Sequence, residues 1–374
     1  MAKNTPDRKL TAEEIDAFGA ELDALRARIV ADIGEADAKY IRNIERTVRY
    51  TEVAGRGLLY AGIFPPAFVL GTTLLGISKI IENMELGHNV MHGQYDWMRD
   101  PHLEGNTYEW DTAGTADNWR YTHNYMHHTY TNVMNKDHDV GYGLVRLFPE
   151  QKWEPRFLAN PVLAVLLGVF FEWFVAAQRL ELERWVGAKS KAERKAEARR
   201  IAEEFKPIGK KMKKQAFKDY VFFPLLAGPF FPIVAAGNFG ANVIRNLWAW
   251  MIIFCGHFTS DAEVFPESVI ENETRGHWYL RQLRGSSNLT GGKLMHIMSG
   301  NLSHQIEHHL FPDIPGRRYA EMSVEVKKIC EKYGQHYNTG SLAKQFATVW
   351  GRLFRYALPN GKGGQPVAAE PLAA

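Results

Sequence analysis

The sequence predicts an all-α integral membrane protein, with about four transmembrane helices and a cytosolic helical cap that holds a metal site. Three observations predict this fold class: long apolar stretches, charged segments between them, and clusters of histidine in polar segments. The 374 residues carry 45 Lys+Arg and 42 Asp+Glu, so the chain lacks the concentrated basic charge of a nucleic-acid-binding protein. Its two cysteines, Cys255 and Cys330, are too few for a disulfide framework and favour a reducing compartment.

The first apolar stretch covers residues 57–78, where 22 consecutive residues carry no charge. This length is sufficient to cross a bilayer. Pro65 and Pro66 interrupt it, so we expect two helices that meet at a proline elbow and cross twice before the first histidine cluster. The alternative, core helices of a soluble protein, fits poorly with three such stretches in one chain.

Two further apolar stretches follow. Residues 157–178 contain Glu172 as their only charge, and residues 220–258 contain only Arg245. A charge within the shorter stretch favours a helix that lies in the membrane interface. The longer stretch suits two short crossings with a turn near Gly237-Asn238.

The segment between these stretches, residues 189–218, has 12 Lys/Arg and four Glu, so the positive-inside rule places it in the cytoplasm. A common metal site requires an even number of crossings between His128 and His304, which two crossings within 220–258 provide. In the other arrangement, residues 157–178 span the membrane and the basic segment lies outside. The basic segment favours the first arrangement.

The charge pattern also predicts the domain organisation. Residues 1–45 form a charged, helix-forming region without the apolar core and cleavage site of a signal peptide. Residues 46–320 form the membrane domain with the histidine clusters. Residues 321–374 form a C-terminal cytosolic helix and a flexible tail.

Three short clusters contain eight of the 14 histidines within 17 positions. Residues four apart share one face of a helix, so each pair at this spacing directs two imidazoles to one point. Eight imidazoles exceed the needs of one tetrahedral zinc, and two metal ions with about four ligands each fit the number. Redox-active iron is the preferred identity, although the spacing also permits two zinc ions. The clustered residues are His88 and His92; His123, His127 and His128; and His304, His308 and His309.

The runs around these clusters resemble the three histidine boxes of membrane fatty acid desaturases. The third, from Ser299 to Pro312, reads SGNLSHQIEHHLFP, and the first two read GHNVMHG and HNYMHH in the expected order. The resemblance covers roughly residues 50–320 and is strongest to bacterial acyl-CoA desaturases of the stearoyl-CoA Δ9 type. It implies a di-iron centre with O₂ as co-substrate, on the cytosolic side of four transmembrane helices.

The resemblance also implies a ninth ligand, and His257 occupies the expected place after the last crossing. Related animal enzymes have an asparagine four residues before this histidine, where this chain has Ile253. Asn301 is a candidate replacement because it lies three residues before His304. Possible partners of the metal ligands are His138 with its neighbour Asp137, and His296.

The activity that this resemblance implies is O₂-dependent insertion of a cis double bond into a long-chain acyl-CoA or acyl-lipid. The sequence contains no fused cytochrome b5 motif, ferredoxin-like cysteine set or GxGxxG fingerprint. We therefore expect a separate NADPH-dependent flavin/iron–sulfur reductase, and localisation in the bacterial inner membrane with a cytosolic active site. The alternatives are a di-iron lipid or alkane hydroxylase, and a non-enzymatic membrane metal-binding protein.

Overall fold

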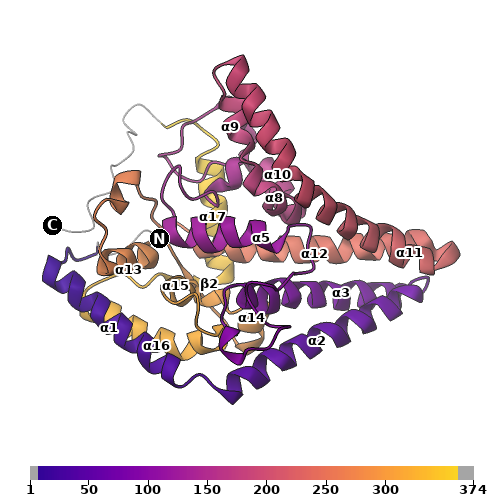
Figure 1. Cartoon of the computed structure of the whole chain (residues 1–374), viewed down its shortest axis with the longest axis horizontal. Coiled ribbons are helices and arrows are strands. Elements are labelled where there is room, and N and C mark those ends of the chain that lie inside the picture. Colours follow the sequence, from indigo (N-terminus) through magenta and orange to yellow (C-terminus); the bar gives the residue numbers. More distant parts are fainter. Residues whose placement is uncertain (1–6, 361–374) are drawn as a thin grey trace.

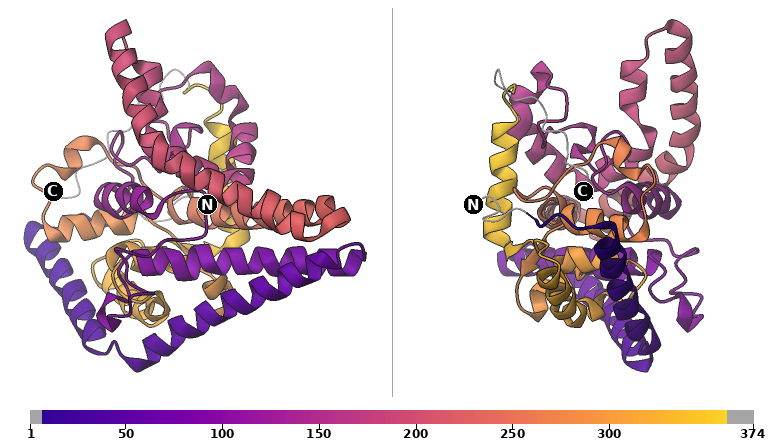
Figure 2. Two further views of the ribbon diagram at one scale, coloured as in Figure 1. Left: turned by 45° about the vertical axis from the view of Figure 1, so that its right-hand side comes forward. Right: turned by 90° about the vertical axis from the view of Figure 1, so that its left-hand side faces the viewer.

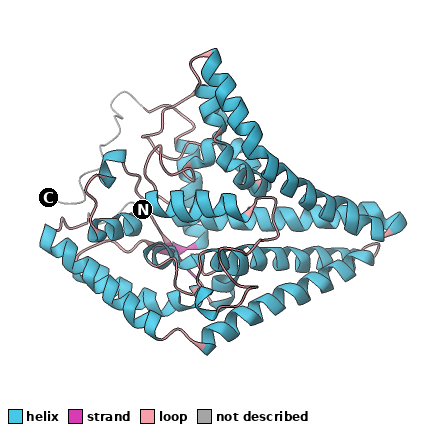
Figure 3. Ribbon diagram, in the orientation of Figure 1, coloured by secondary structure: helices cyan, strands magenta, loops and turns pink. Residues whose placement is uncertain are grey.

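The computed structural model describes residues 7–360, and nearly all regular structure within this range is helical (Figure 3). The exception is a pair of three-residue parallel strands, β1 (Asn288–Thr290) and β2 (Thr339–Ser341), in which Asn288 pairs with Thr339. The predicted helical fold class is thus confirmed. The predicted flexible tail lies mostly in residues 361–374, outside the described residues.

The first helical hairpin joins α2 (Glu35–Tyr60) to α3 (Pro65–Ile81). The predicted proline elbow is present, because Pro65 occupies the first turn of α3, where a missing backbone N–H costs nothing. The two helices approach closely at Gly55, where an added Cβ would lie 2.7 Å from the Leu75 nitrogen. The helix beginning at Pro65 continues to Met91, through a π-helical segment and α4 (Asn89–Met91), and is long and apolar enough to cross a membrane.

The second hairpin begins with α10 (Lys191–Phe217), passes through α11 (Phe223–Leu226) and returns along α12 (Phe231–His257). The predicted turn near Gly237-Asn238 is wrong, since both residues lie inside α12. The chain instead reverses at Gly228, whose φ of 53° suits glycine. The tips of both hairpins lie at the same end of the molecule, on the right of Figure 1.

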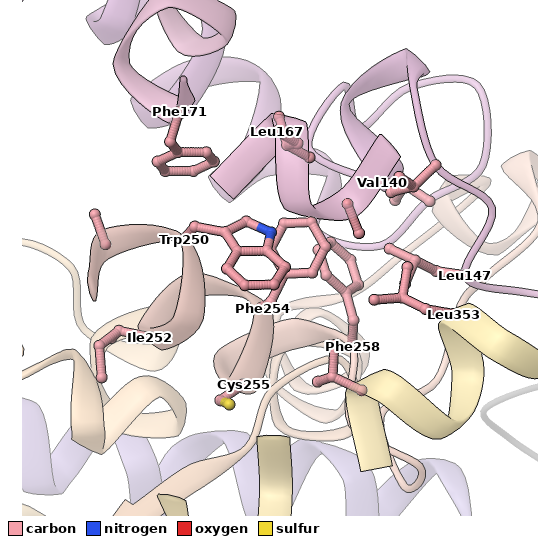
Figure 4. Packing of buried hydrophobic residues seen from close by; sticks show 14 of the residues in the cluster. Val140, Leu147, Leu167, Phe171, Trp250, Ile252, Phe254, Cys255, Phe258 and Leu353 are labelled. Atoms are coloured by element: carbon pink, nitrogen blue, oxygen red, sulfur yellow. The ribbon is translucent and has the colours of Figure 1, made fainter. Parts of the chain in front are cut away.

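Residues 157–178 do not form one straight helix. They contribute α7 (Asn160–Val169) and α8 (Phe171–Ala177), and the helical segments around the break meet at 90°. Both pack against α12 in an apolar core, where the Phe171 ring lies above Trp250 (Figure 4). The single charges of the second and third apolar stretches pair with each other, with Arg245 Nη2 2.5 Å from Glu172 Oε1.

The cap lies at the other side of the molecule and joins segments from both ends of the chain. Helix α1 (Ala12–Ala31) packs against α13 (Arg275–Arg284) and α16 (Tyr319–Lys332) (Figure 2). Their shared core also includes α15 (Gln305–Leu310), which carries two of the clustered histidines. The remaining helices are α5 (Ala116–Trp119), α6 (His128–Tyr130), α9 (Leu182–Gly187), α14 (Lys293–Met298) and α17 (Leu342–Arg355).

Candidate metal centre

The first two histidine clusters lie on helices that contain π-helical turns. One such segment, Glu82–His88, ends on the first histidine, and another, Arg120–His127, carries two histidines of the second cluster. Turns of this kind are frequent at functional sites because they shift the direction in which side chains point. The third cluster lies on α15, and His257 ends α12. Four separate elements therefore bring imidazoles to one place.

Eight of the nine predicted histidine ligands come together in the structure. They form two groups, one of four imidazoles and one of three. Within each group, the ring nitrogens lie within 4.8 Å of one another. His128 lies between the groups, with ring nitrogens within the same distance of those of His308 and His309. The first group comprises His88, His92, His123 and His308, and the second comprises His127, His257 and His309.

The first group has the open nitrogens that a metal ion requires. The Nε2 atoms of its four imidazoles are buried and have no hydrogen-bond partner within residues 7–360. Meanwhile His88 Nδ1 lies 2.9 Å from Asn89 Oδ1, and His308 Nδ1 lies 3.3 Å from the Tyr319 hydroxyl. A hydrogen bond at Nδ1 directs the lone pair of Nε2 towards a metal. Buried nitrogens without partners are costly, so the group fits a bound cation.

In the second group, the Nε2 atoms lie against one another. His257 Nε2 is 3.3 Å from His127 Nε2 and 3.0 Å from His309 Nε2. The Nδ1 atoms face acceptors. His257 Nδ1 lies 3.1 Å from the Gly285 carbonyl oxygen, and His309 Nδ1 lies 3.0 Å from Gln282 Oε1. With Nδ1 donating, Nε2 of a neutral imidazole is an acceptor. A cation between these nitrogens would satisfy all of them together.

The electrostatic environment keeps most of these imidazoles neutral, which metal ligation requires. Burial, followed by the neighbouring imidazoles, lowers the pKa of five of them well below the usual range; these are His92, His123, His128, His308 and His309. Burial also acts to lower the pKa of His127. The carboxylates of Asp137 and Asp139 outweigh it and raise that pKa to about 9.

Asp137 is the predicted partner residue that the structure places against a histidine of the two groups. Its carboxylate oxygens lie 2.9 and 3.0 Å from His127 Nδ1. The sequence analysis missed Asp139, which lies 3.6 Å from the same nitrogen. His138 instead points towards Glu181, at 3.5 Å.

His304 stands apart from the two groups. His304, with φ −103° and ψ 56°, is the last residue of the short helical turn Leu302–His304, and α15 begins only at Gln305. The spacing of four from His304 to His308 therefore does not place both on one helical face. The His304 ring stacks on that of His296, with ring centres 4.6 Å apart, and His296 Nδ1 lies 2.7 Å from the Ser303 hydroxyl.

Asn301 is also displaced from its expected position. It has a left-handed φ of 55° and precedes the short helical turn that contains His304, so the two residues do not share a helical face. Its amide donates hydrogen bonds to both oxygens of the buried Glu85 carboxylate, at 2.9 and 3.0 Å. Asn301 thus stabilises the helix before the first cluster and does not join either group of imidazoles.

Gln305 takes the place that was predicted for His304, and the sequence analysis missed it. Its amide nitrogen lies 2.9 Å from His257 Nε2, and its Oε1 is buried without a partner. Rotating the amide by 180° exchanges these atoms and directs the oxygen towards the second group. The spacing carried a signal for this role, because Gln305 and His308 are three residues apart on α15.

A pocket adjoins the imidazoles. His88, His123, His127 and His257 line one end of it. Apolar side chains line its length, including Met84, Val175, Ala249, Ile253 and Leu302. The lining of this pocket therefore suits an apolar molecule beside the candidate metal centre.

The fold and the site define a helical protein with a buried centre of eight imidazoles beside an apolar pocket. The profile of the fatty acid desaturase family matches residues 64–341, and the chain belongs to this family. It is 45% identical to the NADPH-dependent stearoyl-CoA 9-desaturase of Mycobacterium tuberculosis, over 94% of this chain and 82% of that protein. It is 28% identical to the sn-1 linoleoyl-lipid 6-desaturase of Synechocystis, over 75% of this chain and 77% of that protein. The family predicted from the histidine clusters is confirmed.

Proposed function

We propose that this desaturase introduces a cis double bond at the Δ9 position of a long-chain acyl-CoA, using O₂ and a His-ligated di-iron centre. The observation that carries the proposal is the meeting of two imidazole groups at one end of an apolar pocket. The 45% identity to a stearoyl-CoA 9-desaturase supports the acyl-CoA substrate and the bond position.

Two iron ions, when bound, would supply the activation of O₂ and the removal of two hydrogens from neighbouring methylenes. The first would be held by His88, His92, His123 and His308, and the second by His127, His257, His309 and Gln305, with His128 between them. Asp137 holds the proton on His127 Nδ1 and so keeps Nε2 free for the metal.

The protein positions the substrate through the shape of the pocket. Ile253 and Leu302 lie on two different elements and present apolar surface next to the ligand-bearing residues His257 and Gln305. Such surface excludes water and holds one pair of methylenes beside the centre. Proximity and orientation of this kind account for a large part of an enzyme's rate acceleration.

We propose that the tips of the two helical hairpins insert into the inner membrane from the cytosolic side, with about four crossings in all, while the basic residues 189–218 of the second hairpin stay in the cytoplasm. Both tips expose large apolar side chains: Ile63 and Phe64 on the first hairpin, and Leu225 and Leu226 on the second. Exposing these apolar side chains to water is unfavourable, whereas lipid would cover them. The metal centre lies away from these tips, towards the cap, which supports a cytosolic active site.

We further propose that electrons come from a separate NADPH-dependent flavin/iron–sulfur reductase. The relative from Mycobacterium tuberculosis is named as NADPH-dependent. This chain has only two cysteines, both free and buried, so it cannot hold a cysteine-ligated iron–sulfur cluster itself.

The proposal is tested by expressing the chain, with a compatible reductase, in a host that lacks its own desaturase. A cellular acyl product that has lost two hydrogens supports desaturation, whereas the gain of one oxygen would identify a hydroxylase. Metal analysis of the purified protein should find about two iron ions per chain. Zinc in their place, without O₂ consumption, would refute the proposal. His309→Ala should abolish the product, and His336→Ala, a histidine outside both groups, should not.

A further inference from the structure

The pocket beside the metal centre follows one face of α12. Arg245, Ala249, Ile253 and His257 all line it, at intervals of four residues. Residues at this spacing share a helical face. With a rise of 1.5 Å per residue, the pocket extends roughly 18 Å from the metal ligand His257 to Arg245.

An ion pair lines the pocket at the position along α12 that is farthest from His257. Arg245 on α12 and Glu172 on α8 both line the pocket, and their side chains are 2% and 4% exposed. Glu172 Oε2 and Arg245 Nη1 have no further partner among the described residues, so the two charges depend on each other.

The ion pair is anchored to the bend between α7 and α8. Arg245 donates from Nε and Nη2 to Asn246 Oδ1, at 3.1 and 2.9 Å. Asn246 Nδ2 in turn donates to the carbonyl of Val169, the last residue of α7, at 2.8 Å. Three helices thus hold the pair in place, and it cannot rotate away as a lone side chain could.

A second hollow lies beyond the ion pair, and the two hollows share Glu172 and Asn246 as walls. The second hollow is lined by Phe170 and Phe239, which are 42% and 48% exposed. Its apolar lining would accept an acyl chain. The ion pair and its asparagine are therefore what separates the pocket at the metal from further apolar space.

We propose that the Glu172–Arg245 ion pair is the end wall of the acyl pocket and sets the longest acyl chain that the enzyme desaturates. The inference rests on the proposed function, because it assigns the pocket to an acyl chain. A methyl end that entered between the two side chains would leave two buried charges unpaired. That cost is far greater than the cost of displacing an apolar side chain, so the pair stops the chain sharply.

The test is the double variant Glu172→Ala/Arg245→Ala, which removes both charges together and joins the two hollows. The measurement is the ratio of longer to shorter desaturated products, in the desaturase-deficient host supplied with saturated fatty acids of increasing length. One methylene in an apolar pocket changes selectivity by about tenfold or more, so the ratio should rise by at least that factor. An active double variant with the wild-type ratio would overturn the inference.

The matched control is Lys79→Ala/Asp219→Ala. This pair is equally buried, with Nζ and Oδ2 2.7 Å apart, and lines neither hollow. Its loss should leave the product ratio at the wild-type value, and an equal shift would overturn the inference.

A second variant tests the wall without removing it. Ala249 lies between Arg245 and His257 on the same face, so Ala249→Leu should shorten the pocket and favour shorter products. A binding assay provides a readout that does not need turnover: saturated acyl-CoAs should raise the Tm up to a limiting length, and the double-alanine variant should move that limit upwards. If the limiting acyl length is the same in the double-alanine variant and the wild type, the ion pair is not the end wall. If the wild-type enzyme forms no desaturated product, the proposed function itself is refuted.

Discussion

Asp137→Asn should weaken one of the two metal sites while sparing the other. The Asp137 carboxylate contacts His127 Nδ1 at 2.9 and 3.0 Å, and also accepts the backbone N–H groups of Asn132, at 2.7 Å, and Asp139, at 2.9 Å. Asparagine preserves the shape of this side chain, but its amide nitrogen replaces one acceptor oxygen, so one of the hydrogen bonds from these backbone N–H groups should be lost. It removes the charge that raises the pKa of His127 to about 9, which makes the imidazole a weaker ligand.

The loss of such a carboxylate typically costs 10- to 100-fold in metal affinity, which corresponds to about 1.4–2.7 kcal/mol. Competition with a chelator, followed by metal analysis, should show about one tightly held metal ion per chain in the variant and about two in the wild type. Asp261→Asn is the control, since Asp261 lies 3.8 Å from His336, outside both imidazole groups. Equal retention of both metal ions by Asp137→Asn would refute the assignment of His127 to the second site.

The other predictions concern the third cluster, the cap and the hairpin. His304→Ala should retain about two metal ions per chain, whereas Gln305→Ala should lose affinity for one; the reverse result in metal analysis would contradict the geometry of α15. Arg318→Met should lower the free energy of unfolding by about 3 kcal/mol, because it leaves the buried Asp37 carboxylate without its main partner. Burial acts to raise the pKa of Asp37, but the hydrogen bonds from Arg318 and the Gly34 backbone, together with the charges of Arg318 and Arg317, outweigh it and lower the pKa. The stability that this pair gives the wild type should therefore be complete above about pH 4 and be lost as the pH falls below that value. Thermal unfolding of wild type and variant across this pH range should show the difference between them shrink at low pH, and a constant difference would contradict the prediction. Gly55→Leu should lower the Tm sharply, because even a Cβ would lie 2.7 Å from the α3 backbone; an unchanged Tm would contradict this contact between α2 and α3.

Local sequence patterns were sufficient to predict the helical class, the proline elbow and the metal-binding chemistry. The elbow depends on Pro65, which cannot donate a backbone hydrogen bond in any fold. The histidine clusters are equally local, since His123, His127 and His128 lie on adjacent turns and must point to neighbouring positions. The family resemblance added His257, and the structure places it within the second group.

Patterns were insufficient wherever the backbone departs from a regular helix. His304 was assigned to the centre on the assumption of a continuous helix, but the helix begins one residue later, and this shift brings in Gln305 instead. The turn predicted at Gly237 was wrong for the opposite reason, because the backbone there is a regular helix. Glycine in a long apolar helix is tolerated when a neighbouring helix packs closely against it, and Leu59 occupies that space.

The sequence by itself determined where the imidazoles cluster along the chain, because a spacing of four residues between histidines is a local property. Only the tertiary structure decided how these residues divide into two groups, and which carboxylate and amide join them. It also paired Glu172 with Arg245 across two apolar stretches that each contain a single charge. Such pairing depends on which distant helices pack side by side, and no local spacing encodes it.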